Sequence, residues 1–226
     1  MKYLFILFVF LGDSKFYAQT PQQDSLKKDV KKYTLAIESN PKDVRAYYKR
    51  GLSKMRLKDN EGSIKDYDQA IKLNPAYDTA YNARGYSKHL LKDYVGAVMD
   101  YTKALEINPK FYPAYSNRGF SKFSLTDYKG AVSDYSKVIE LASMSNYAIG
   151  AYYYRGINKY WLNDYKGAIE DYDKVIKFYP KDALAHLNKG NCKFKLGDKE
   201  GACLDWKKAD ELGQKNAKEV ISKYCN

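Results

Sequence analysis

Three charged residues recur along the sequence at a fixed spacing that could support chemistry. Each set has a basic residue, a lysine four residues later and an aspartate sixteen residues after the basic residue. The five sets are Arg50, Lys54 and Asp66; Arg84, Lys88 and Asp100; Arg118, Lys122 and Asp134; Arg155, Lys159 and Asp171; and Lys189, Lys193 and Asp205. Two bases four residues apart share one helix face, where they could bind an anion. The fixed aspartate instead favours an internal ion pair in each unit.

The three cysteines, Cys192, Cys203 and Cys225, all lie near the C-terminus. Cys225 follows Cys192 by 33 residues, almost the period of the repeats described below, so we expect all three to lie close together. In an oxidising compartment Cys225 would then form a disulfide with Cys192 or with Cys203. The alternative is three small buried residues. No histidine accompanies the cysteines, so we expect no metal site.

Residue constellations typical of enzymes are absent from the sequence. It contains two histidines, His89 and His186, and the second occupies an aromatic position of the repeat pattern. No phosphate-binding loop and no metal-ligand spacing is found. We therefore expect no catalysis and no cofactor, and a function that depends on binding.

Repeats of about 34 residues position these side chains. A glycine follows the first basic residue of each set, at Gly51, Gly85, Gly119, Gly156 and Gly190, with spacings of 34, 34, 37 and 34 residues. Small and large apolar residues recur around each glycine at helical spacing, which predicts two amphipathic helices per unit. An aspartate between the two helices is placed to cap the second one. These aspartates are Asp59, Asp93, Asp127, Asp164 and Asp198.

Two glycines recur in every unit. The first lies inside a predicted helix, where glycine costs about 1 kcal/mol, so its recurrence predicts a partner helix that crosses too closely for a Cβ atom. The second precedes a small residue, and we expect it to serve the same close crossing. The second glycines are Gly62, Gly96, Gly130, Gly167 and Gly201.

The pattern of glycine, alanine, aromatic residue and proline resembles the tetratricopeptide repeat over residues 24–216. The resemblance implies an all-α protein, an α–α superhelix or solenoid of five helical hairpins over residues 26–226. We expect a half repeat at 26–41, full repeats at 44–77, 78–111, 112–148, 149–182 and 183–216, and a capping helix at 216–225. The C-terminal unit is similar to the related Sel1-like repeat. The sequence departs from the family where Arg or Lys precedes the glycine and where Lys follows it by three residues.

Residues 1–18 differ in composition from the rest of the chain. A short basic start is followed by an apolar run of ten residues at 3–12, which predicts a secretory signal peptide. The run is shorter than the roughly 20 apolar residues that span a membrane. Cleavage near Ala18 would leave a polar linker at 19–25. We expect an exported protein, periplasmic or secreted, with no transmembrane span in its mature form.

The formal net charge is +12, which is compatible with binding to nucleic acid. The basic residues are spread over every unit instead of being clustered, and the chain carries a predicted export signal. We therefore expect a solvated basic surface and no nucleic-acid partner.

The resemblance also implies a binding surface, because the first helices line the concave face of tetratricopeptide stacks. The candidate partner-binding residues on this face are Tyr48, Asn82, Tyr86, His89, Asn117, Phe120, Phe123, Tyr153, Tyr154, Tyr160 and Trp161. Tyr48 and Leu52 stand where some family members have a Lys and an Asn that hold a C-terminal carboxylate, so we do not expect that mode of binding.

These aromatic residues are more numerous than the hairpin cores require, and extended apolar patches usually mark binding sites. We expect a scaffold or adaptor of the bacterial cell envelope that holds a peptide segment of another protein in an aromatic concave groove. A glycan-binding envelope protein is the alternative, although acidic residues, which commonly accompany aromatic sugar platforms, are missing from the groove. The rings could instead pack on one another between neighbouring first helices. The sequence names neither the partner nor the oligomeric state.

Overall fold

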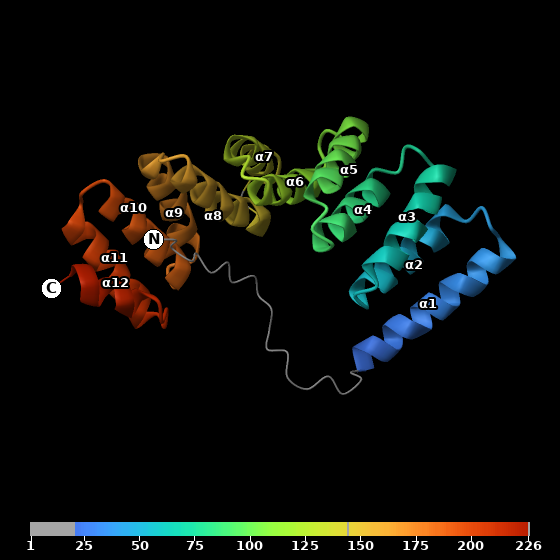
Figure 1. The fold of residues 1–226 in the computed structure, drawn as a ribbon, viewed down its shortest axis with the longest axis horizontal. Coiled ribbons are helices and arrows are strands. Elements are labelled where there is room, and N and C mark those ends of the chain that lie inside the picture. The colour runs from blue at the N-terminus through green and yellow to red at the C-terminus, as the bar shows by residue number, and fades with distance from the viewer. Residues whose placement is uncertain (1–20, 144, 226) are drawn as a thin grey trace.

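The computed structural model describes residues 21–143 and 145–225, and over these ranges the chain forms helices and no strands. The helices are α1 (Pro21–Ser39), α2 (Val44–Arg56), α3 (Asn60–Leu73), α4 (Asp78–Leu90), α5 (Tyr94–Ile107), α6 (Tyr112–Ser124), α7 (Tyr128–Leu141), α8 (Asn146–Trp161), α9 (Tyr165–Phe178), α10 (Ala183–Lys195), α11 (Lys199–Glu211) and α12 (Ala217–Tyr224). They stack in chain order into a curved arch with α1 at one end and α12 at the other (Figure 1). The predicted all-α solenoid of helical hairpins is confirmed.

Five hairpins make up the body of the arch, and each joins a first helix to a second helix. They are α2–α3, α4–α5, α6–α7, α8–α9 and α10–α11. The fourth differs at its start, because α8 has 16 residues whereas α4 and α6 have 13. The three extra residues before Gly156 therefore lengthen the N-terminal end of α8.

The start of α1 corrects the predicted linker. Residues 19–25 were expected to be a polar linker, but α1 already begins at Pro21. Proline is favoured in the first turn of a helix, where its missing N–H is not needed, and Asp24 adds an acidic side chain that suits the helix dipole. The predicted signal peptide, residues 1–18, lies outside the described residues.

The aspartates between the helices cap the second helices as expected. In α7, for example, the Asp127 carboxylate accepts a hydrogen bond of 2.9 Å from the Gly130 backbone N–H. A Cβ atom at Gly130 would collide with that same carboxylate. The expectation that the second glycine serves the helix crossing was therefore wrong, because it makes room for the cap.

The first glycine of each unit does serve close packing inside the hairpin. A Cβ atom at Gly51 would lie 2.7 Å from Cε1 of Tyr67, and the ring of Tyr67 is fully buried. The corresponding ring in the fifth hairpin is Trp206, which would lie 2.6 Å from a Cβ atom at Gly190. The recurring glycine and the large aromatic residue sixteen positions later are thus two halves of one contact.

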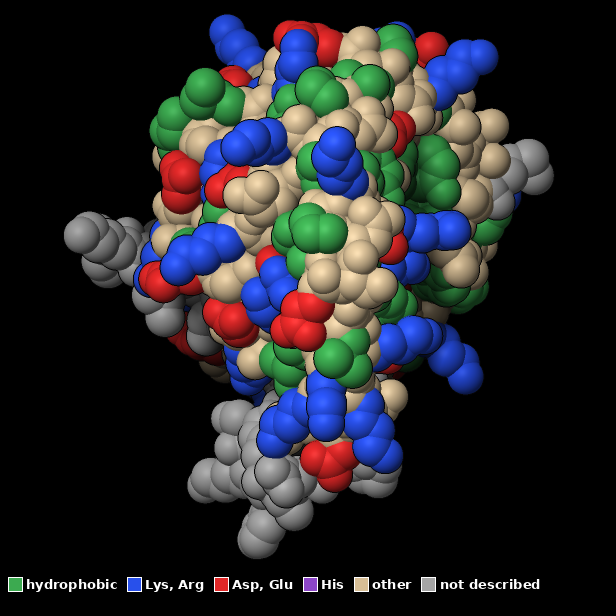
Figure 2. Space-filling view, turned by 90° about the vertical axis from the view of Figure 1, so that its right-hand side faces the viewer, with side chains coloured by type: hydrophobic (Ala, Val, Ile, Leu, Met, Phe, Trp, Pro, Cys, Tyr) green, Lys and Arg blue, Asp and Glu red, His purple; other side chains and the backbone are tan. Residues whose placement is uncertain are grey.

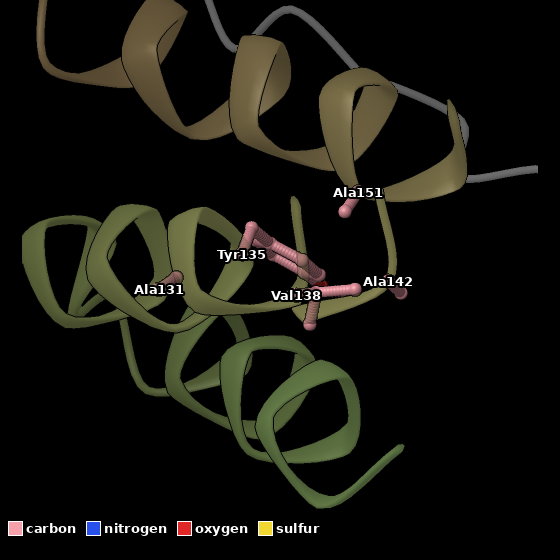
Figure 3. Close-up of a cluster of buried hydrophobic side chains, with 5 residues drawn as sticks. All are labelled: Ala131, Tyr135, Val138, Ala142 and Ala151. Carbon is pink, nitrogen blue, oxygen red and sulfur yellow. The ribbon is translucent and has the colours of Figure 1, made fainter. Parts of the chain in front are cut away.

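The apolar core is a series of small clusters instead of one large one. Figure 3 shows the cluster at the junction of α7 and α8, where the ring of Tyr135 lies among small side chains. Val138, Ala142 and Ala151 of this cluster come from both sides of the junction. Because each cluster joins only neighbouring elements, the array is held together locally, as expected for a solenoid.

The C-terminal end of the arch is closed by α12 and a disulfide. Cys203 of α11 is bonded to Cys225, with their Cα atoms 5.7 Å apart, and Cys192 is free and buried. One of the two predicted pairings, Cys225 with Cys203, is therefore present. Tyr224 of α12 contacts the rings of Phe194 and Trp206, which covers the last hairpin. None of the helices described is long and apolar enough to cross a membrane.

Candidate functional site

The repeated charged residues form ion pairs inside each hairpin and are not a row of anion sites. Arg118 donates from Nε to Oδ2 of Asp134 at 2.9 Å and from Nη2 to Oδ1 at 2.7 Å. Lys122 Nζ lies 2.9 Å from Oδ2 of the same carboxylate. The side chain of Asp134 is only 3% exposed, so its carboxylate oxygens are paired with Arg118 and Lys122 and do not face solvent. The first, second and fourth hairpins repeat this geometry.

The arginine also reaches across to the preceding repeat, which the sequence analysis missed. Nη1 of Arg84 donates to Oδ1 of Asp68 at 2.7 Å, and Nη1 of Arg118 donates to Oγ1 of Thr102 at 3.1 Å. Arg50 and Arg155 make the same kind of bond to hydroxyl groups. The acceptors are Thr34, Asp68, Thr102 and Ser136. They occupy one repeat position, next to the buried aromatic residue, and that recurrence was the available signal.

The charged set of the fifth hairpin is arranged differently, since Lys189 replaces the arginine. Its Nζ lies 2.8 Å from Oδ1 of Asp173 in the preceding repeat and 3.7 Å from Oδ1 of Asp205. His186, which replaces the usual tyrosine, has its Nδ1 3.6 Å from the same Asp205 oxygen. A single ammonium group thus takes the place of the two-pronged guanidinium group, and His186 lies beside the same carboxylate.

A row of rings crosses the first helices in the middle of the array. The ring centroid of His89 on α4 lies 4.9 Å from that of Phe120 on α6, which lies 6.1 Å from that of Tyr154 on α8. Tyr154 is also stacked on Tyr135, 5.6 Å away. Residues predicted from three separate repeats are therefore brought together.

A second group of rings lies at the C-terminal ends of α6 and α8. Phe123 contacts Tyr128 at 5.6 Å, and Tyr128 is stacked on Trp161 at 5.8 Å with an interplanar angle of 12°. Trp161 also meets Tyr160 edge-on. Tyr128, the first residue of α7, was not predicted. An aromatic residue directly after the capping aspartate in three units could have indicated it.

Polar side chains of the predicted set join neighbouring first helices. Asn117 Nδ2 donates to Asn82 Oδ1 at 3.0 Å, and Nδ1 of His89 lies 2.8 Å from Oγ of Ser121. Burial lowers the pKa of His89, so its ring favours the neutral form. The hydroxyl of Tyr153 accepts a bond of 3.2 Å from Asn188. These hydrogen bonds therefore join neighbouring first helices directly.

Exposure divides the predicted residues into two kinds. Tyr86, Tyr154 and Trp161 are 39%, 39% and 40% exposed, whereas the other rings of the set are half-buried. Tyr48 lies apart from the row and contacts Tyr67 and Tyr77 near the N-terminal end of the array. Many rings thus pack on one another between helices, as the alternative interpretation expected, and three keep a large accessible surface.

Basic side chains do not gather into one patch on the face that Figure 2 shows. At the end of the arch that carries α1, Lys and Arg alternate with Asp, Glu and apolar side chains. Among the described residues no group of three or more His, Cys, Asp or Glu side chains could hold a metal ion. The aromatic row across α4, α6 and α8 is therefore the strongest candidate for a binding surface.

Comparisons with known proteins agree with this architecture. A family model described as TPR repeat matches residues 52–92 and 159–197, and one described as tetratricopeptide repeat matches residues 78–111. No curated protein matches the chain. The matched segments are similar to tetratricopeptide repeats, and the fold is the helical solenoid of tetratricopeptide-repeat structures. The similarity of the last unit to Sel1-like repeats stays a prediction.

Solved structures share the fold at low sequence identity. The structure described as YrrB, a TPR protein with an unusual peptide-binding site, is 21% identical, with a TM-score of 0.76 over 86% of this chain and 98% of that one. A MamA structure is 23% identical, with a TM-score of 0.70 over 80% of this chain and 94% of that one. A tetratricopeptide repeat protein from Parabacteroides merdae ATCC 43184 is 24% identical, with a TM-score of 0.59 over 91% of this chain and 80% of that one.

Proposed function

We propose that this protein is a non-enzymatic scaffold or adaptor that binds a segment of another protein in its concave groove. The observation that carries the proposal is the set of rings on α4, α6 and α8, of which Tyr86, Tyr154 and Trp161 keep about two-fifths of their surface accessible. Tyrosine and tryptophan are enriched among the residues that dominate binding energy at interfaces. The peptide-binding site named for the structurally similar YrrB gives further support.

The chemistry of the groove indicates the kind of segment it would bind. Its middle is aromatic, and Lys49, Arg56 and Lys195 lie on the first helices of its two ends. An extended or helical segment with apolar anchors and acidic flanks complements this distribution. Asn82 and Asn117 share one hydrogen bond, and the surrounding rings would supply most of the affinity through apolar contacts.

Truncation of exposed groove rings tests the proposal. We expect Trp161→Ala to weaken partner binding by about 2 kcal/mol, as truncation of an interface anchor does, while the melting temperature changes little. Phe120→Ala is expected to weaken binding similarly and also to lower stability, because its ring contacts His89 and Tyr154. Phe178→Ala is the matched control, since Phe178 is 47% exposed but lies at the end of a second helix.

The measurement is affinity capture from bacterial envelope extract, followed by calorimetry on the partner that is identified. Supporting partners are retained by the wild type and by Phe178→Ala and are lost with Trp161→Ala. Capture that is the same for all variants contradicts binding in the groove. Binding to a glycan array, with no protein partner sensitive to Trp161, would favour the glycan-binding alternative.

We also propose that the protein acts outside the cytoplasm, in the bacterial cell envelope. The Cys203–Cys225 disulfide supports this location, because structural disulfides persist in oxidising compartments. The apolar run at 3–12 supports it independently. Intact-mass measurement of the exported protein under non-reducing conditions should show a chain that begins near Gln19. Its mass should be lower than that of the reduced chain by the two hydrogen atoms lost when one disulfide forms. A cytoplasmic product that retains residues 1–18 and has three free thiols would contradict export.

A further inference from the structure

A small hollow lies among side chains of α6, α7 and α8. Its volume is about 10 Å³. It is lined by Phe120, Phe123, Tyr135, Tyr154, Ile157 and Asn158. Three of these residues belong to the aromatic groove, so the hollow lies within the surface assigned above to partner binding.

Asn158, which lines this hollow, carries an unused acceptor. Its side chain is 1% exposed, and its Nδ2 donates to the backbone carbonyl of Tyr154 at 2.8 Å. That bond fixes the orientation of the amide, because the reverse orientation would place two oxygens against each other. Oδ1 of Asn158 is buried and has no hydrogen-bond partner among the described residues. An acceptor buried without a partner destabilises the folded state.

The other repeats use the same position differently. Two residues after the first glycine, they carry Ser53, Ser87, Ser121 and Cys192. Ser87 pairs with Ser63 at 2.8 Å, and Ser121 pairs with His89 at 2.8 Å. The serines thus have partners within the protein, whereas the fourth repeat carries a larger amide whose oxygen is left unpaired. At this repeat position, the unpaired oxygen belongs to the repeat that contributes Tyr154 and Trp161 to the groove.

We propose that the hollow is a specificity site that receives a hydroxyl-bearing side chain of the bound segment, threonine in particular. The proposal rests on the peptide-binding function proposed above. A hollow of about 10 Å³ accommodates one water-sized group, so it fits a hydroxyl group and is too small for an amide or guanidinium group. The threonine hydroxyl donates to Oδ1 of Asn158, and its methyl group packs on Phe120 and Tyr154.

The test uses a phage-displayed library of random twelve-residue peptides as the probe, selected on the disulfide-bonded mature protein. Parallel selections use Asn158→Leu, which replaces the amide with an apolar side chain of similar size, and Gln69→Leu, which changes an exposed amide on the second helix α3, outside the groove. Selected peptides are synthesised with threonine and with its isostere valine at the enriched position. Their dissociation constants are measured by fluorescence anisotropy.

Wild type and Gln69→Leu are expected to enrich threonine or serine next to apolar residues, and the threonine-to-valine change should weaken binding about tenfold, because a buried acceptor is then left unpaired. Asn158→Leu should lose this discrimination and melt at a higher temperature than the wild type. This rise is measured without any peptide and shows that the variant folds.

Two outcomes overturn the assignment while the proposed function stands. The first is selected peptides with no hydroxyl preference. The second is equal threonine and valine affinities on both wild type and Asn158→Leu, as expected if one water molecule fills the hollow. Failure of every variant to select peptides overturns the proposed function and this site with it. Binding of glycans alone, sensitive to Asn158→Leu, would reassign the acceptor to a sugar hydroxyl and also overturn the proposal.

Discussion

At the scale of single residues, the repeated aspartate of each charged set pairs with two basic side chains at once. The carboxylate of Asp134 receives two bonds from Arg118 and lies within 2.9 Å of the ammonium of Lys122. The fixed spacing in the sequence predicted this pairing, because two bases on one helix face need a counter-charge when the hairpin closes. The bond from Arg118 to Thr102 was not predicted, because the spacing within one unit carries no information on contacts to the preceding unit.

Removal of the central aspartate should be costly. We expect Asp134→Ala to lower the free energy of unfolding by about 3 kcal/mol, because it leaves two partly buried cations without their counter-charge. The control is Glu140→Ala, which breaks the exposed pair between Lys137 and Glu140 and should cost less than about 1 kcal/mol. Urea denaturation measures both. An Asp134→Ala variant that is fully stable but loses affinity for an anionic ligand would restore the anion-site interpretation.

At the scale of helices and hairpins, the two recurring glycines solve different packing problems. Gly51 lets the ring of Tyr67 lie against α2, and Gly62 leaves room for the carboxylate of Asp59. The sequence showed that both positions need a small residue, but it did not show which group occupies the space. Helix existence and order followed from the repeat period. The neighbours of a given Cα atom depend on tertiary geometry and could not be read from that period.

Glycine-to-alanine substitutions separate the packing glycines from a dispensable one. Gly51→Ala should destabilise the protein by about 1–3 kcal/mol, since its Cβ would lie 2.7 Å from a fully buried ring that cannot move away. Gly150→Ala is the control, because Gly150 lies in α8 with nothing within 4 Å of its added Cβ. It should stabilise by about 0.5–1 kcal/mol. Thermal melts with opposite shifts are expected, and a stabilised Gly51→Ala would refute the close contact.

At the scale of the whole molecule, the sequence predicted the helical array, and its set of groove residues stays a prediction. It did not predict which rings contact one another. Family registers place Phe120 and Tyr154 on the concave face, but only the structure shows that these rings touch across neighbouring helices. The hollow beside Asn158 was also missed. The replacement of a repeated serine by asparagine in one unit was visible, but the missing partner of its oxygen was not.

The C-terminal end of the array depends on its disulfide. Cys225→Ser should lower stability by up to about 3 kcal/mol, as loss of a cross-link of this span does. Because α12 contacts chiefly the last hairpin, the loss should be confined to that end. Hydrogen exchange should show faster exchange in α12 and α11 and no change at α4. Cys192→Ser, which restores the serine of earlier repeats, is the control, and equal exchange in both variants would contradict the prediction.

The hydrogen bonds and ion pairs that an arginine or lysine forms with the preceding repeat differ in their sensitivity to salt. The contacts of Arg84 with Asp68 and of Lys189 with Asp173 join charged groups, and the two aspartates are about half exposed. The corresponding contacts with Thr102 and Ser136 in the middle involve neutral hydroxyl groups. Dissolved ions screen exposed charge pairs and leave neutral hydrogen bonds nearly unchanged. Rising ionic strength therefore loosens the α3–α4 and α9–α10 junctions on either side of the aromatic row. The junctions within the row, and the junction of Arg50 with Thr34 at the N-terminal end, keep their geometry.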